Sequence, residues 1–340
     1  MSKPKVAFYW CSSCGGCEEA VVDLAEGILD VVAAVDIAFW PVALDFKRSD
    51  VEALPDGALA VSFINGAIRS SEQVEMVELL RRKSRLVVAF GSCAHLGGIP
   101  ALANFFERDA ILDKVYRESP GVDNPKAVFP QQHTSASVKT LEQPGPAGAP
   151  NGHTLELPTF DEEVRTLDQT IDVDYYLPGC PPPGKLVQQA LQAILEGTLP
   201  AKGTVLAPDV ALCQDCPRKD TKPEKLLVKE FKRPHLVETD PKTCLLAQGL
   251  LCLGPATRSG CDAPCVAGNM PCTGCLGPTS RVRDHGAKAL SAVASILDSG
   301  DEDEIAVLLD GIPDAAGTFY RYSLAGSLLG GRRRSKGVHA

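Results

Sequence analysis

The sequence has no long apolar run, no net positive charge and no export signal. None of its apolar stretches reaches the roughly 18 residues that a membrane-spanning helix needs, so we expect no membrane span. The formal net charge is −9, and this acidic balance excludes a general nucleic-acid binder, which would present a basic face. A short basic run at 332–336 is expected to be solvated. Residues 1–5 lead directly into an apolar run, without a twin-arginine signal, so we expect a cytoplasmic protein.

Cysteine is the residue in excess. The chain has 13 cysteines among 340 residues, and a cytoplasmic protein does not normally use so many as disulfides. Metal ligation is the alternative that explains their number. Thirteen equals three groups of four plus one, which would leave a single spare thiol beside three four-thiolate sites.

The first 200 residues alternate strand and helix signals. Short apolar runs predict buried parallel strands, and apolar residues at helical spacing predict helices between them. Such alternation predicts a parallel sheet with helices on both faces, most simply a doubly wound, flavodoxin-like α/β domain over residues 1–200. The expected strands are 6–10, 35–40, 58–64, 86–90 and 173–177, and the expected helices are 18–34, 71–83 and 185–197.

Three other regions depart from this pattern. Residues 109–172 contain turn signals, and we expect a long insertion with little regular structure, of the kind that often faces a partner. Residues 201–280 hold eight cysteines and weak periodicity, which predicts a small irregular domain organised by metal. Residues 281–340 are expected to form a helix at 286–297, a solvated acidic turn at Asp301–Glu304 and a tail.

The five cysteines of the N-terminal half all follow expected strands. Cys11, Cys14 and Cys17 come after the first strand, Cys93 after the fourth and Cys180 after the fifth. The carboxyl ends of parallel strands meet at one edge of a sheet, so these thiols should converge. Of the overlapping pairs we choose Cys14 and Cys17, because they lie nearest the N-terminal dipole of the following helix. Cys11 is then the spare, expected to be a small buried hydrophobe.

The eight cysteines of the C-terminal half include two C-x2-C pairs, a strong indication of metal binding. Four thiolates suit either an iron–sulfur cubane or a tetrahedral zinc ion, so this pattern leaves the metal open. Several clusters in one chain would act as stepping stones for electrons, whose transfer falls steeply with distance. The simplest split by sequence gives two consecutive groups of four, Cys213, Cys216, Cys244 and Cys252, then Cys261, Cys265, Cys272 and Cys275.

The N-terminal half contains three specific motifs, Cys14-Gly15-Gly16-Cys17-Glu18-Glu19, Gly91-Ser92-Cys93-Ala94 with Gly97-Gly98, and Pro178-Gly179-Cys180-Pro181-Pro182. These motifs resemble the proximal-cluster motifs of [NiFe]-hydrogenase small subunits. They occur more loosely in the related cluster subunit of respiratory complex I, which is shorter and lacks the eight-cysteine tail. The tail contains the segments Cys244–Gly249, Cys252–Pro255 and Cys272–Pro278, which look most like the non-F420-reducing (methyl-viologen-reducing) cytoplasmic hydrogenases.

The resemblance implies a subunit that relays electrons through three [4Fe-4S] clusters. H2 would be oxidised to two protons and two electrons at a Ni–Fe site on a separate large subunit. The electrons would leave through an iron–sulfur or flavin partner, such as a heterodisulfide-reductase-type complex. The implied ligands are Cys14, Cys17, Cys93 and Cys180 for the proximal cluster, Cys261, Cys265, Cys272 and Cys275 for the medial cluster, and Cys213, Cys216, Cys244 and Cys252 for the distal cluster.

The ligand positions differ from those of the periplasmic uptake enzymes in two places. Cys213 stands where those enzymes use a histidine, and Cys265 supplies a fourth thiolate to a medial cluster that has three in them. Glu18 and Glu19 lie beside Cys17, as candidates for a proton relay toward the large subunit or as ordinary helix-start carboxylates. His95, close to Cys93, is expected to support the cluster or the fold rather than to act as a ligand.

Two alternatives to a hydrogenase subunit stay open at this point. An iron–sulfur subunit of a complex I-like oxidoreductase would explain the N-terminal motifs but not eight further cysteines. A zinc-binding interaction module would explain the C-x2-C pairs but not the cysteines at three strand ends. The hydrogenase subunit is the leading hypothesis because it explains both halves.

Overall fold

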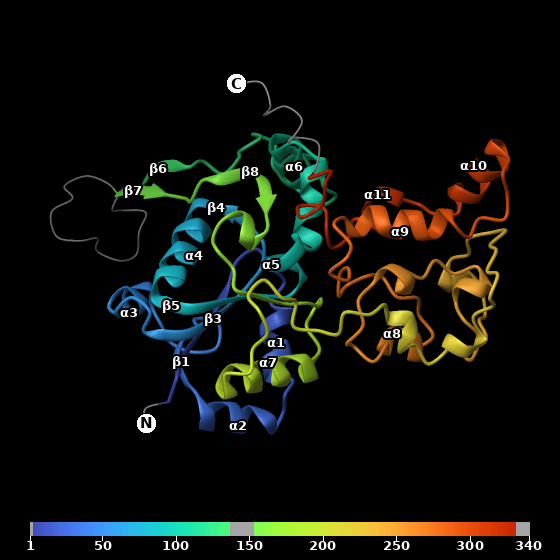
Figure 1. Cartoon of the computed structure of the whole chain (residues 1–340). Helices are drawn as coiled ribbons and strands as arrows, with labels where there is room; N and C mark the ends of the chain where they lie inside the picture. The colour runs from blue at the N-terminus through green and yellow to red at the C-terminus, as the bar shows by residue number, and fades with distance from the viewer. Residues whose placement is uncertain (1–2, 137–152, 331–340) are drawn as a thin grey trace.

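The computed structural model describes residues 3–136 and 153–330. It consists of a sheet domain and a smaller, loop-rich tail that lie side by side (Figure 1). The basic run expected at 332–336 lies outside the described residues. Within the described part of the chain, no helix has both the length and the apolar character that crossing a bilayer requires.

Five parallel strands form the sheet of the first domain. Their order is β2-β1-β3-β5-β9, and numbering only these strands along the chain gives 2-1-3-4-5, the flavodoxin-like order. The structure therefore confirms the predicted fold class. The strands are β1 (Lys5–Trp10), β2 (Asp36–Phe39), β3 (Leu59–Asn65), β5 (Ser84–Phe90) and β9 (Tyr175–Leu177).

Helices cover both faces of the sheet and bury two apolar layers against it. On one face Val21 of α1 and Leu186 of α7 pack with Phe8 and Phe63. On the other face α4 is held by Ser70, whose side chain caps the helix by accepting a hydrogen bond from the backbone of Gln73. The helices are α1 (Gly16–Val22), α2 (Gly27–Ala34), α3 (Arg48–Glu52), α4 (Ser71–Lys83), α5 (Ser92–Leu96) and α7 (Gly184–Glu196).

The prediction of a single helix over 18–34 is wrong, because the structure has two helices there, α1 and α2. The last turn of α1 tightens, with the backbone N–H groups of Leu24 and Ala25 each donating to the carbonyl three residues earlier. Ala25 then adopts a left-handed φ of 51°, which ends the helical hydrogen-bond pattern. α2 starts again at Gly27 in a new direction.

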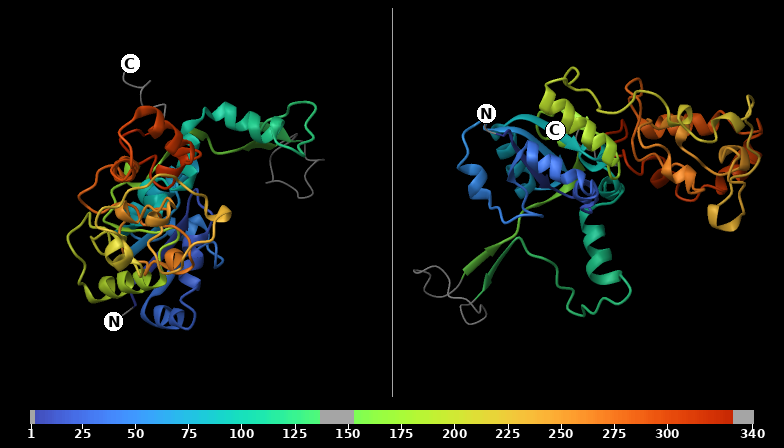
Figure 2. Two further views of the ribbon diagram at one scale, coloured as in Figure 1. Left: turned by 90° about the vertical axis from the view of Figure 1, so that its right-hand side faces the viewer. Right: turned by 90° about the horizontal axis from the view of Figure 1, so that it is seen from below.

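The insertion has more regular structure than the sequence predicted. α6 (Arg108–Asp113) continues into a wide helical turn, and β6 (His133–Ala136) pairs with β7 (His153–Glu156) in an antiparallel ribbon. β8 (Phe160–Arg165) pairs with β4 (Ile68–Ser70), a partner far away in the sequence. Helix and ribbon project from the sheet domain as two arms (Figure 2).

The described part of the tail contains short helical turns, loops and four α-helices. The acidic segment Asp301–Glu304, expected to be a turn, instead starts α10, and the Asp301 side chain caps it by accepting from the backbone N–H groups of Asp303 and Glu304. Acidic residues in a first helical turn are favoured by the helix dipole. The helices are α8 (Pro264–Ala267), α9 (His285–Ala294), α10 (Glu302–Asp310) and α11 (Ala315–Phe319), of which α9 matches the helix predicted at 286–297.

The end of the described chain returns to the sheet domain. Leu324 and Ala325 are buried against Ala67, Ala101 and Val164. Hydrogen bonds fix the contact, since the Gln169 side chain donates to the carbonyl of Ala325 at 2.9 Å. The tail is therefore attached to the sheet domain at both of its ends.

Candidate functional site

Four thiols meet at the carboxyl edge of the sheet. Cys14 and Cys17 follow β1, Cys93 lies in α5 directly after β5, and Cys180 follows β9. The loops that carry them are joined by backbone hydrogen bonds, because Gly91 N–H donates to the carbonyl of Leu177 and Ser92 N–H donates to the carbonyl of Gly179, both at 2.8 Å. These four cysteines therefore come together at one edge of the sheet, as their positions after the strands predicted.

These four sulfurs lie close enough to influence one another electrically. Burial is the main reason that the pKa of Cys17 is raised, and the neighbouring charges of Cys93, Cys180 and Cys14 raise it further. Burial likewise raises the pKa of Cys93 to about 12, with added contributions from Cys180 and Cys14 and an opposing one from the backbone N–H of Ile99. The thiolates of Cys17 and Cys93 would therefore need positive charge nearby to stabilise them.

Glycines leave room beside these sulfurs. A Cβ atom on Gly91 would lie 2.3 Å from the Cys17 sulfur, and one on Gly98 would lie 2.4 Å from the Cys93 sulfur. Both glycines have positive φ, which other residues rarely adopt. The close approach of backbone to sulfur therefore depends on glycine at these two positions.

A second group of thiols lies in the tail around Cys213. Burial raises the pKa of Cys213 to about 11; the charges of Cys252, Cys216 and Cys244 add to this and Lys222 opposes it. The backbone N–H of Arg218 lies 3.4 Å from the Cys216 sulfur as a donor. Gly254 again leaves space, since a Cβ there would be 3.3 Å from the Cys213 sulfur.

The third group surrounds a cavity of about 370 Å³ between the tail and the sheet domain. Burial raises the pKa of Cys275 to about 11; the charges of Cys261, Cys180 and Cys265 add to this, and the backbone N–H of Cys180 opposes it. The fourth tail thiol of this cavity is Cys272, which is buried. Burial raises the pKa of Cys272, and the charge of Cys252 adds more to this than the charge of Cys275, so Cys272 borders both tail groups.

Contacts join the three groups into one continuous series. Cys180 of the first group approaches Cys275 of the third, as the pKa effects on Cys275 indicate. The backbone N–H of Cys272, in the third group, lies 3.3 Å from the sulfur of Cys252, in the second. The group around the cavity therefore lies between the other two.

Comparisons with known proteins identify the family. Residues 14–194 match the family described as NADH ubiquinone oxidoreductase, 20 Kd subunit. The chain is 39% identical over 328 residues to an F420-non-reducing hydrogenase iron-sulfur subunit of Archaeoglobus profundus, with 96% of this chain and 97% of that protein covered. The chain belongs to the F420-non-reducing hydrogenase iron–sulfur subunits. An F420-non-reducing hydrogenase subunit from Methanothermobacter thermautotrophicus is 34% identical over 333 residues, covering 96% of each chain.

Family membership makes the chain a subunit of an oxidoreductase and supports the leading hypothesis over its two alternatives. A solved [NiFeSe] hydrogenase from Desulfovibrio vulgaris Hildenborough is similar in fold, with a TM-score of 0.52 and 17% identity over 82% of this chain and 94% of that one. The match to residues 14–194 is limited to the sheet domain, whereas the similarity to the hydrogenase subunit of Archaeoglobus profundus extends through the cysteine-rich tail.

The donor set of the three groups fits iron–sulfur clusters. Every group is made of thiols alone, and backbone N–H groups donate to the sulfurs of Cys216 and Cys252 at 3.4 and 3.3 Å. Such N–H···S bonds are a means by which proteins tune clusters. Among the described residues, no three His, Cys, Asp or Glu side chains converge on the position of a single metal ion.

The two candidate proton-relay carboxylates differ sharply in environment. Glu18 is 3% exposed, and its Oε1 accepts a hydrogen bond of 3.1 Å from the Asn65 side chain. Its Oε2 accepts no well-formed hydrogen bond among the described residues, and the indole N–H of Trp40 is the donor near this carboxylate. Burial raises the pKa of Glu18, while Trp40 and Asn65 partly offset this. Glu19 is exposed on the same helix, so only Glu18 occupies an interior position beside the first group.

Cys11 and His95 lie apart from the ligand positions. Cys11 is buried with Phe39, Ile64 and Ala94 in the apolar layer on the α4 face of the sheet. His95 is half-buried, and its ring packs against Tyr176 with 4.6 Å between centroids. Burial and the nearby charges of Arg258 and His285 lower the pKa of His95 to about 3, so the ring is neutral.

Two residues of the tail that lie beside the thiols, Gly254 and Arg218, were not predicted from the sequence. Gly254 packs against the Cys213 sulfur, and a glycine two positions after Cys252 was the signal that could have identified it. Arg218 is buried between the tail thiol groups, but in a lysine-rich run it carries no signal that separates it from solvated neighbours.

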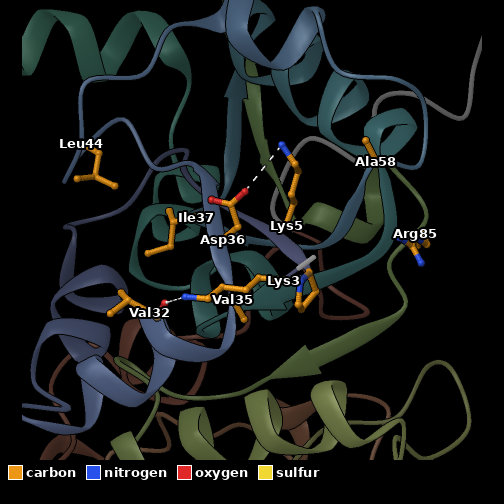
Figure 3. Close-up of a pocket in the computed structure, with 10 residues that line it drawn as sticks. Lys3, Lys5, Val32, Val35, Asp36, Ile37, Leu44, Ala58 and Arg85 are labelled. Carbon is orange, nitrogen blue, oxygen red and sulfur yellow. Dashed lines mark hydrogen bonds and ion pairs between the residues drawn. The ribbon is translucent and has the colours of Figure 1, made fainter. Parts of the chain in front are cut away.

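A larger cavity of about 760 Å³ lies at the opposite edge of the sheet (Figure 3). Its cationic side chains already have partners. Lys3 donates to the carbonyl of Val32 at 2.8 Å, Lys5 pairs with Asp36 at 3.8 Å, and Arg85 donates to the carbonyl of Gly57. The candidate site therefore lies with the thiols and not in this cavity.

Proposed function

We propose that this chain is the electron-transfer small subunit of a [NiFe]-hydrogenase and holds three [4Fe-4S] clusters. Bound clusters would supply one-electron transfer between H2 oxidation on a large subunit and an external acceptor. The proximal ligands would be Cys14, Cys17, Cys93 and Cys180, the medial ligands Cys261, Cys265, Cys272 and Cys275, and the distal ligands Cys213, Cys216, Cys244 and Cys252.

The observation that carries this proposal is the continuity of the three thiol groups. The first and third groups approach each other at Cys180 and Cys275, and the third and second at Cys272 and Cys252. Separate structural metal sites have no reason to form an unbroken series, whereas an electron relay requires one. The series begins at the exposed Cys14, whose neighbour Gly15 lies beside the partly exposed ring of Trp10.

The large subunit would dock at this exposed end, and the acceptor would dock beside the distal group. We propose an iron–sulfur or flavin acceptor such as a heterodisulfide-reductase-type complex, in the cytoplasm. The support is the chain's similarity to F420-non-reducing hydrogenase subunits. The boundaries we propose are a sheet domain over 1–200, a medial and distal domain over 201–280 and a C-terminal part over 281–340.

We further propose that Glu18, rather than Glu19, holds a proton at the large-subunit face. Glu18 has the buried carboxylate, and its Oε2 accepts no well-formed hydrogen bond among the described residues, whereas Glu19 faces solvent. In the complex with the large subunit, Glu18→Gln should slow H2-dependent turnover and leave the iron content unchanged. Glu19→Gln is its matched control and should retain turnover.

The test of the main proposal separates the chain from its large subunit. The complex purified without oxygen should show cluster reduction by H2, followed as loss of visible absorbance and appearance of EPR signals. The chain alone should hold the same clusters and not respond to H2. H2 oxidation by the isolated chain would contradict the proposal, as would a complex whose clusters H2 leaves oxidised.

A further inference from the structure

Arg218 is the buried cation of the tail that has no ion-pair partner among the described residues. Its side chain is 3% exposed. Nη1 donates to the carbonyls of Asp240 and Thr243, both at 3.2 Å. Nη2 donates to the carbonyl of Val266 at 2.9 Å and to the side-chain oxygen of Asn269 at 2.8 Å. Every acceptor is a neutral oxygen.

The acceptors place the guanidinium between two thiol groups. Thr243 directly precedes Cys244 of the distal group, and Val266 directly follows Cys265 of the medial group. The backbone N–H of Arg218 itself donates to the sulfur of Cys216 at 3.4 Å. One side chain therefore contacts segments that carry ligands of both tail groups.

The other buried guanidinium of the tail is neutralised in the ordinary way. Arg258 pairs with Asp209 at 3.0 Å and also donates to the carbonyls of Ala207, Pro208 and Pro278. Arg218 makes no such ion pair among the described residues. Asp284 is the one carboxylate buried between residues 201 and 330, and it caps α9 instead, accepting from Ala287 N–H at 2.9 Å. Asp240 is exposed and offers Arg218 its carbonyl; hydrogen bonds from Thr243 and Lys242 are the main reasons that the pKa of its carboxyl is lowered, and the charge of Arg218 adds a smaller contribution across solvent.

Burying an unpaired guanidinium is costly, because the charge loses its hydration and stays protonated. A fold that keeps one needs a nearby negative charge. Four thiolates around a cubane carry net negative charge, and this charge increases by one when the cluster takes up an electron. No bond forms or breaks in that step. The interaction with a buried cation is strong because little water screens it.

We propose that Arg218 is the counter-charge of the medial and distal clusters and raises their reduction potentials. Its positive charge stabilises the reduced form more than the oxidised form, since the reduced cluster is more negative. Arg218 is thus a positioning residue for electron transfer, acting through charge as well as through its hydrogen bonds. This inference rests on the proposed function, because it requires clusters in both tail groups.

The test is a redox titration of the whole complex with its large subunit, followed by EPR. In Arg218→Gln the medial and distal clusters should be harder to reduce, with the ratio of reduced to oxidised cluster lowered about tenfold at a fixed potential. That ratio corresponds to about 59 mV for a one-electron couple. The proximal cluster should keep its potential, since the cation contacts no segment that carries its ligands.

Two variants separate charge from structure. Arg218→Lys keeps the charge and loses the forked hydrogen bonds, so it should lower thermal stability while leaving the potentials near those of the wild type. Asn269→Asp places a carboxylate on Nη2, so it should lower the potentials while the guanidinium and its bonds remain. Asn269→Asp also keeps the test decisive if Arg218→Gln fails to assemble. Lys219→Gln removes an exposed neighbouring charge and should produce a smaller shift, because water and salt screen it.

The outcomes distinguish this inference from the proposed function. If the wild-type complex holds fewer than three clusters, both the proposed function and this inference are contradicted. Three clusters whose potentials are unchanged in both Arg218→Gln and Asn269→Asp would overturn only the inference. Loss of iron in Arg218→Gln and Arg218→Lys alike, with wild-type potentials in Asn269→Asp, would make Arg218 a structural residue and also overturn it.

Discussion

The sheet domain and the tail hold thiols in different ways. In the sheet domain, a parallel sheet with two apolar layers positions the loops of Cys17, Cys93 and Cys180. In the tail, two small apolar clusters around Phe231 and Leu250 are joined by loops and short turns. The first region thus has a core of its own, whereas the second has the composition of a domain that metal organises.

This difference predicts that one chain combines a preformed site with sites that fold around their metal. The sheet domain positions its thiols through strand ends, which are set by the hydrogen bonds of the sheet. In the tail, side chains such as Arg218 and Arg258 connect carbonyls of the separate loops that carry the thiols. Four experiments can break or sharpen the comparison.

Removing iron is expected to produce the largest difference between the two regions, in the hydrogen exchange of their backbone amides. In apo protein the backbone amides of residues 210–280 should exchange rapidly with deuterium, while those of β3 and β5 stay protected. The reason is that the tail loses the bonds that organise it, and the sheet keeps its apolar core. Hydrogen exchange by mass spectrometry measures both regions in one sample. Equal protection of the tail with and without iron would contradict the distinction.

The next effect is expected from a methyl group beside a sulfur. Gly91→Ala would place Cβ 2.3 Å from the Cys17 sulfur, so the variant should lose the proximal cluster, about four iron per chain. Gly254→Ala is the matched change in the tail, where the distance to Cys213 is 3.3 Å. Because that contact can relax by a few tenths of an ångström, iron loss should be smaller. A larger loss of iron in Gly254→Ala than in Gly91→Ala, measured by iron analysis, would contradict this expectation.

A core truncation should affect the sheet domain alone. Leu80 of α4 is fully buried, and Leu80→Ala should lower the free energy of unfolding by about 3 kcal/mol through lost burial and a residual cavity. Exchange at β5 amides reports this change, and EPR of the tail clusters should be unaltered. Altered medial or distal signals would mean that the two regions are not independent.

The smallest effect concerns pH and is also confined to the sheet domain. Burial opposes ionisation of Asp174, but Lys202, Arg81 at 2.7 Å and the backbone N–H of Val87 outweigh it, so the pKa is lowered. The ionised carboxylate therefore stabilises the fold above the unfolded pKa of about 3.9, and this contribution is lost as pH falls through the folded pKa.

Asp174→Asn should accordingly be less stable than wild type at pH 7, and the difference should shrink below about pH 4. Urea unfolding of both proteins, followed by circular dichroism at each pH, measures the difference. If the difference in the free energy of unfolding between wild type and Asp174→Asn grew toward low pH, the lowered pKa of Asp174 would be contradicted.

The sequence predicted what depends on local signals. α4 was predicted with both ends from its apolar residues at helical spacing, and the structure adds the capping box of Ser70 and Gln73 that fixes its start. The convergence of Cys14, Cys17, Cys93 and Cys180 followed from the geometry of parallel sheets. The division of the eight tail cysteines into two groups of four stays a prediction. The start of α10 was missed although Asp301 before an acidic first turn is a usual helix signal.

The remaining features depend on contacts between distant residues. Alanine favours helix, so nothing local predicts the left-handed Ala25 that ends α1. β4 forms because Ile68 pairs with Arg165, nearly one hundred residues away. The role of Arg218 could not be predicted from the sequence, because its burial and its four neutral hydrogen-bond acceptors come from residues distant in the chain.

The most direct test of the relay is the content of iron, acid-labile sulfide and zinc per chain, on protein purified without oxygen. Cys11→Ala and Cys17→Ala would accompany the wild type, since Cys11 lies in the apolar layer and Cys17 in the first thiol group. We predict about twelve iron and twelve sulfide with little zinc, unchanged in Cys11→Ala and reduced in Cys17→Ala. About four iron with zinc in the tail would contradict the three-cluster relay.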